Sequence, residues 1–196
     1  MSSRNPSAGA VVRSVVAGLV GGLVASYVME RSQAALARLS NGHDDQPHDD
    51  PATYKAADAA WRAVTGRPVP REDKPAAGSA MHYAFGGAVG AIYGAAAARA
   101  NDVTAWAGLP FGATLWLAAD EIGVPMAGFS KAPTAYPLST HLSAFAAHLV
   151  YGATTDAVRK LLVRAAQGRP GGRGRQHPTP SHQKTADVRD ENPMRN

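Results

Sequence analysis

The sequence contains no cysteine among its 196 residues. This absence excludes a disulfide-stabilised scaffold and a zinc site with cysteine ligands. The sequence also lacks a phosphate-binding loop, a dinucleotide-binding glycine motif, a Gly-x-Ser-x-Gly elbow and a His-Glu-x-x-His pair. No motif in the sequence therefore indicates a DNA- or ATP-dependent enzyme. No catalytic residue is predicted.

Charge is scarce over a long central region. Residues 75–155 contain five charged side chains in 81 positions: Arg99, Asp102, Asp120, Glu121 and Lys131. A soluble globular protein distributes charges over every exposed helix face. The segregation favours a small multi-span membrane protein whose main partner is the lipid bilayer. A soluble alanine-rich bundle is the alternative, because the candidate spans are only just long enough to cross a bilayer.

Four stretches, at residues 10–29, 79–98, 103–123 and 138–155, have the length and apolar composition of membrane spans. We expect an all-α fold, in which these spans form a four-transmembrane-helix bundle over residues 10–166. Residues 1–9 form a polar lead, residues 30–78 a non-cytoplasmic loop and residues 167–196 a disordered basic tail. Cleavage of the first span as a signal peptide is the competing interpretation of residues 10–29.

The loop between the first two spans contains two features. Residues 52–65 predict an amphipathic helix, since Tyr54, Ala57 and Trp61 share one face. This helix can lie in the membrane interface or pack outside the membrane, and the sequence leaves both open. The acidic run at residues 43–50 predicts a solvated loop.

Positive charge determines the expected orientation. The formal net charge is +5, and residues 156–196, with nine Lys and Arg against four acidic residues, account for all of it. By the positive-inside rule, both termini of a multi-pass inner-membrane protein would then be cytoplasmic. The Gly-Arg run in this tail has no interleaved aromatic residue to stack on bases, so no nucleic-acid partner is expected.

Glycines recur at four-residue spacing in three of the candidate spans. Such positions let helix backbones approach closely, which drives association in lipid. The expected role is packing within one chain, and a seam between copies of a homo-oligomer is the alternative. The predicted packing positions are Gly18, Gly22, Gly86, Gly90, Gly94, Gly108 and Gly112.

Ionisable side chains occur at apolar positions of the later spans. The topology predicts that His82, Asp120, Glu121 and His141 meet near the non-cytoplasmic surface, and that His148 and Tyr151 continue the stripe on one helix face. This cluster could serve as a proton or ligand site, or as a divalent-metal site through the first four residues. Hydrogen bonds that only fix the helices are the plainer interpretation. No cofactor is predicted.

Four runs resemble the YagU-like family of small bacterial inner-membrane proteins. They are MHYAFG at residues 81–86, WLAADEIGVP at 116–125, YPLSTH at 136–141 and AHLVYG at 147–152. The resemblance covers roughly residues 79–164 and implies location and topology rather than chemistry. We expect an inner-membrane protein without an assigned activity, structural or stress-related. A small transporter or channel using the His/Asp/Glu cluster is the first alternative, and a metal-dependent membrane enzyme is the second.

Overall fold

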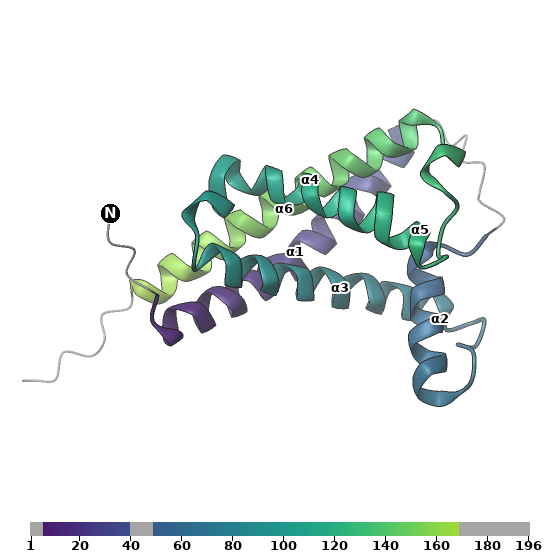
Figure 1. Cartoon of the computed structure of the whole chain (residues 1–196), viewed down its shortest axis with the longest axis horizontal. Coiled ribbons are helices and arrows are strands. Elements are labelled where there is room, and N and C mark those ends of the chain that lie inside the picture. Colours follow the sequence, from purple (N-terminus) through teal and green to yellow (C-terminus); the bar gives the residue numbers. More distant parts are fainter. Residues whose placement is uncertain (1–5, 40–48, 169–196) are drawn as a thin grey trace, which may run out of the picture.

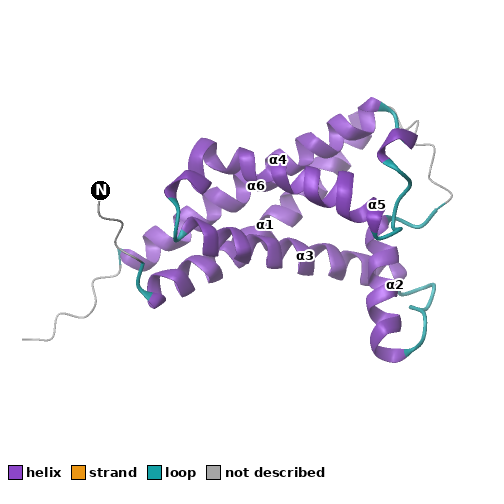
Figure 2. Cartoon of the chain, in the orientation of Figure 1, coloured by secondary structure: helices purple, strands orange, loops and turns teal. Residues whose placement is uncertain are grey.

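The computed structural model of the chain describes residues 6–39 and 49–168. Within these residues the fold consists of helices and connecting loops without a strand, which confirms the all-α prediction (Figure 2). The start of the polar lead, most of the acidic run at residues 43–50 and the tail beyond Gly168 lie outside the described residues.

The first helix, α1, extends over Ala8–Leu39 and contains 32 residues. Ser7 caps it, because the Ser7 hydroxyl accepts a hydrogen bond of 3.3 Å from the Ala10 N–H. No proline interrupts it, and residues 14–29 carry no charge. Its part Ala8–Leu36 is the one segment of the described chain that is long and apolar enough, by length and composition, to span a membrane as a single helix.

Two further long helices pack against α1. These are α3, Lys74–Ala97, with a proline in its first turn, and α6, Leu138–Gln167, which follows Pro137. Proline fits the start of a helix because the first N–H groups need no intrahelical acceptor. Figure 1 shows that the beginning of α1 and the end of α6 lie at the same end of the molecule. The α6 helix continues twelve residues beyond the predicted span end at residue 155.

The predicted span at residues 103–123 is not one continuous helix. It consists of a 3-10 segment, Asn101–Gly108 (η1), the helix α4, Leu109–Trp116, and a π-helical segment, Leu117–Gly123 (η2). The backbone leaves the helical region because Trp106 and Ala107 have φ 54° and Gly108 has φ 78°. After η2, the short helix α5, Val124–Met126, and a 3-10 turn, Pro133–Ala135 (η3), lead to α6.

The amphipathic helix α2, Ala52–Thr65, has the bounds that the sequence predicts and packs against α3. Figure 1 shows it crossing the end of the bundle where α3 begins. Gly66 ends it in a left-handed conformation, φ 70°. Asp58 accepts hydrogen bonds from Arg62 Nε at 2.7 Å and from the Val69 N–H at 2.8 Å, which hold the following loop. The hydrogen bond from Arg62 is the main reason that the Asp58 pKa lies below its ordinary value.

Many of the buried side chains are small or polar, while many large apolar side chains are exposed. The largest fully buried side chains are those of Tyr93, Tyr151, Thr155, Asp156 and Ser26. Large aliphatic and aromatic side chains lie instead on the surfaces of α1, α3, α4 and α6. Exposed examples are Val12, Val16 and Leu19 in α1, Phe85 and Ile92 in α3, Leu109 and Leu117 in or beside α4, and Leu138, Leu142 and Leu161 in α6.

Candidate functional site

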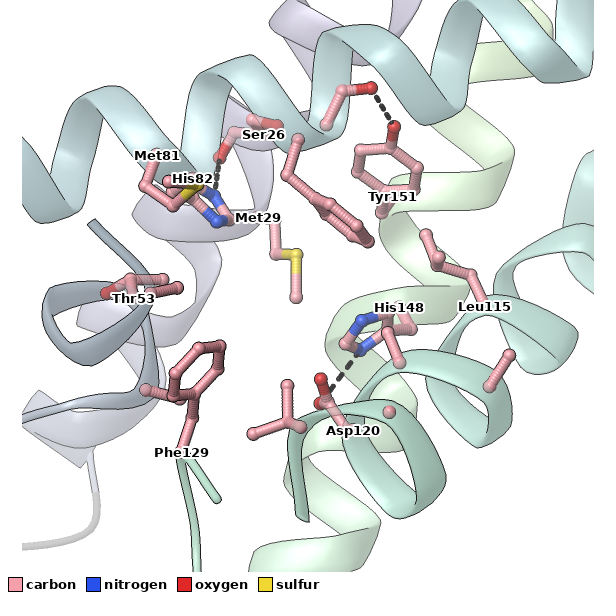
Figure 3. Close-up of a pocket in the computed structure, with 18 of the residues that line it drawn as sticks. Ser26, Met29, Thr53, Met81, His82, Leu115, Asp120, Phe129, His148 and Tyr151 are labelled. Atoms are coloured by element: carbon pink, nitrogen blue, oxygen red, sulfur yellow. Dashed lines mark hydrogen bonds and ion pairs between the residues drawn. The ribbon is translucent and has the colours of Figure 1, made fainter. Parts of the chain in front are cut away.

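A cavity of about 590 Å³ lies at the end of the bundle where α1 leaves, α2 crosses and α3 begins. Its volume is typical of sites for small organic molecules. Alanine, methionine and phenylalanine side chains form much of its wall. Figure 3 shows side chains from several helices pointing toward one space. The polar residues of its wall are Ser26, Gln33, Thr53, His82, Asp120, His148 and Tyr151.

Asp120 and His148 face each other on the wall formed by η2 and α6 (Figure 3). The distance from His148 Nδ1 to Asp120 Oδ2 is 3.6 Å, which is longer than a hydrogen bond. The same His148 nitrogen lies 2.9 Å from the Ala144 carbonyl oxygen and donates to it. The Asp120 side chain is 38% exposed, and within the described residues no hydrogen bond reaches its carboxylate.

The opposite wall is formed by α1 and α3. His82 Nε2 lies 3.4 Å from the Ser26 carbonyl oxygen, a long hydrogen bond between the two helices. The Ser26 hydroxyl is buried and has no hydrogen-bond partner. Tyr151, from α6, donates from its hydroxyl to the Gly86 carbonyl oxygen at 2.5 Å. Its ring is thereby held between α6 and α3 at the inner end of the cavity.

Glu121 and His141 form a separate pair. His141 Nδ1 lies 2.7 Å from Glu121 Oε1, and His141 Nε2 lies 3.0 Å from the Pro133 carbonyl oxygen. Neither residue lines the cavity. The structure thus divides the predicted four-residue cluster, with Asp120 and His82 at the cavity and Glu121 bound to His141 beside it. Asp120 and Glu121 are adjacent residues of η2, and adjacent side chains of a helix point in different directions.

The division also affects the predicted metal candidates. Within the described residues, no group of three or more His, Cys, Asp or Glu side chains is arranged to hold a metal ion. His82, Asp120, Glu121 and His141 do not converge on one point. Histidine and carboxylate ligands bind a divalent metal tightly only when three or more do so.

The glycines of α1 and α3 lie against each other. A methyl group on Gly18 would overlap the Gly90 carbonyl oxygen, and one on Gly22 would overlap the Gly86 carbonyl oxygen. Gly94 faces the backbone of Ser14 in the same way. Glycines also bring α4 and α6 close together. Gly108 and Gly112 lie against backbone atoms of Gly152 and His148. The contribution of these close backbone contacts to the free energy of unfolding stays a prediction.

The other end of the bundle contains a buried ionic network that the sequence analysis missed. Asp156, 1% exposed, accepts a hydrogen bond of 2.9 Å from Tyr93 and lies 3.3 Å from Arg159 and 2.6 Å from Lys160. Arg159 also reaches the Ser14 hydroxyl at 3.4 Å. The spacing of Asp156, Arg159 and Lys160 at i, i+3 and i+4 on one helix was the available signal.

A DUF1440 domain, described as a protein of unknown function, is found over residues 69–157. The match includes α3, α4, η2 and most of α6, and therefore every titratable residue of the cavity wall; α1 and α2 lie outside it. This family has no assigned function, which fits the expectation from the resemblance. No curated protein and no solved structure matches the chain.

Proposed function

We propose that the chain is a multi-pass inner-membrane protein that binds a small, largely apolar molecule in the cavity. Of the alternatives raised by the sequence, a small transporter fits this proposal best. The observation that carries it is the cavity itself, since a purely structural bundle has no need of about 590 Å³ bordered by an Asp120 carboxylate without a hydrogen bond. Ionisable groups inside a membrane bundle usually serve function.

The membrane part of the proposal rests on the distribution of burial. Small and polar side chains are buried, while valine and leucine side chains of α1 are exposed. Lipid solvates apolar surfaces and supplies no drive to bury them, so helices in a bilayer associate through close backbone contacts and hydrogen bonds. In water the same surface would be an aggregation liability.

The proposed topology has four crossings, made by α1, α3, the broken segment from η1 to α5, and α6. An interrupted helix is compatible with a membrane where the irregular backbone is buried in protein or borders a cavity. The basic excess of residues 156–196 supports cytoplasmic termini. The cavity and α2 then lie at the non-cytoplasmic end.

A cavity-filling substitution tests ligand binding. Ala56 lines the cavity from α2, whereas Leu142 is exposed on α6 and does not line it. We expect the purified full-length protein, in a nonionic detergent, to bind the apolar fluorophore N-phenyl-1-naphthylamine saturably at one site. Ala56→Phe should weaken binding at least fivefold, and Leu142→Phe should leave it unchanged. Equal binding by the wild type and Ala56→Phe would favour the structural role instead.

A further inference from the structure

The charges around the cavity favour one class of ligand. Among the described residues that line it, Asp120 has the only carboxylate, and none is lysine or arginine. The titratable groups near that carboxylate are His148, His82 and Glu121. Glu121 is engaged with His141. The described part of the cavity wall therefore contains one carboxylate and no lysine or arginine that could neutralise it.

Within the described residues Asp120 accepts no hydrogen bond, and its one ion-pair neighbour is His148. The His148 Nδ1 atom lies 3.6 Å from the Asp120 carboxylate and already donates to the Ala144 carbonyl oxygen. A carboxylate in an apolar cavity is costly unless a cation or a hydrogen-bond donor compensates it. The Ser26 hydroxyl is buried, has no hydrogen-bond partner among the described residues and lies against Gly86 of α3.

Three aromatic rings border the same space: those of Phe85, Phe129 and Tyr151. Figure 3 shows Phe129 and Tyr151 on different sides of the cavity, with Asp120 below Tyr151 in the view. The faces of aromatic rings attract organic cations, and quaternary ammonium groups are commonly bound among such rings. A bare metal cation would instead leave most of the apolar wall without contacts.

We propose that the cavity binds a lipophilic organic monocation, a quaternary or protonated amine with an aromatic or alkyl substituent. Asp120 would compensate the positive charge, and the phenylalanine and tyrosine rings would contact the organic part. This inference rests on the proposed function, because it names the ligand class of the same cavity.

A pair of isosteric probes separates charge from shape. Phenyltrimethylammonium and tert-butylbenzene have the same outline and differ in the positive charge on the central atom. Binding of each to the full-length protein in nonionic detergent is measured by isothermal titration calorimetry, with empty micelles as the blank. We expect the cation to bind at least tenfold more tightly than the neutral isostere.

Matched variants assign the preference to one carboxylate. Asp120→Asn should reduce the preference below threefold, whereas Asp120→Glu should retain it. Glu121→Gln is the control, since it removes the neighbouring carboxylate, which does not line the cavity. Gel filtration and circular dichroism establish that each variant is folded.

The outcomes distinguish the two proposals. Equal affinity of the two probes, both lost in Ala56→Phe, would overturn the cation preference and leave the ligand-binding function intact. A preference that survives in folded Asp120→Asn would also overturn it. If neither probe binds saturably, or Ala56→Phe does not affect either, the proposed function itself fails.

Discussion

At the scale of single residues, Asp120 and Glu121 are adjacent in the sequence, yet their carboxylates meet different surroundings. Glu121 is bound to His141 at 2.7 Å, while Asp120 borders the cavity beside His148. A hydrogen-bonded pair and a carboxylate without a hydrogen bond respond differently to substitution. Their neighbours in space, rather than in sequence, therefore decide what each residue does.

The Glu121–His141 pair yields a double-mutant prediction. Glu121→Ala and His141→Ala should be non-additive, with a coupling of roughly 0.5–2 kcal/mol, because each removes the same interaction. Asp120→Ala and His141→Ala should be additive, since the structure shows no contact between them. Unfolding in mixed micelles with increasing dodecyl sulfate measures the free energies. Coupling of Asp120 with His141 instead would restore the single four-residue cluster predicted from the sequence.

Asp156 yields the largest expected stability effect. Asp156→Ala leaves buried Arg159 without its carboxylate and removes the acceptor of Tyr93. Breaking a buried ion pair on one side typically costs about 3–5 kcal/mol. Asp102→Ala, at an exposed residue near the same end of the bundle, is the control and should cost less than about 0.5 kcal/mol. Equal unfolding midpoints for the two variants would show that the network adds no stability.

At the scale of elements, the seam between α1 and α3 can be tested with two glycines of one helix. A methyl group at Gly90 would meet backbone atoms of Gly18 and Gly22, whereas one at Gly87 would meet the Leu23 side chain at 3.1 Å. Backbone atoms cannot move aside as a leucine side chain can. We expect Gly90→Ala to lower stability by about 1–3 kcal/mol and Gly87→Ala by less than 1 kcal/mol. Equal effects in thermal unfolding would argue against a tight seam.

The attachment of the loop after α2 should depend on pH. Since folding lowers the Asp58 pKa, the stabilisation from this carboxylate is complete above its ordinary value of 3.8 and is lost as the pH falls through the folded value. We expect faster hydrogen exchange of the Val69 amide in Asp58→Ala at neutral pH. The difference from the wild type should shrink as the pH falls below the ordinary Asp58 pKa of 3.8 and through the lower folded value. Asp73→Ala, which removes an exposed carboxylate, should exchange like the wild type.

Sequence patterns predicted some elements well and others poorly, for physical reasons. The bounds of α2 follow from apolar spacing and from Gly66, both of which are local signals. The break within residues 103–123 depends on left-handed backbone at Trp106 and Ala107, which no propensity of these residues predicts. Hydropathy likewise does not distinguish α- from π-helical turns.

The prediction of the site was incomplete because its contacts depend on how distant segments fold together. Helix ends located His82 and Asp120 at one level, but the pairing of Glu121 with His141 depends on the path of residues 124–137. Asp156 directly follows the span predicted to end at residue 155, and its partner Tyr93 is 63 positions away in the sequence, so no local pattern indicates their contact. Contacts between distant segments lie beyond what spacing in a single sequence can predict.

At the scale of the whole molecule, the proposed topology of four crossings requires α3 to cross the membrane. Only α1 meets the length and hydropathy criteria for a span among the described helices. Burial gives the independent argument: Tyr93 and the glycines of α3 face the bundle, while Ile92 and Phe85 are exposed. A lipid-facing helix with a small-residue seam has this distribution.

Single-cysteine labelling is the most direct test of this claim, because the chain has no cysteine of its own. Val64→Cys, at an 86% exposed position in α2, and Ala100→Cys, at the exposed end of α3, lie on either side of the proposed crossing. In bacterial spheroplasts, a membrane-impermeant maleimide should label Val64→Cys without permeabilisation and Ala100→Cys only after it. Labelling of both cysteines from the same side of the membrane would contradict the multi-pass topology and the placement of the cavity.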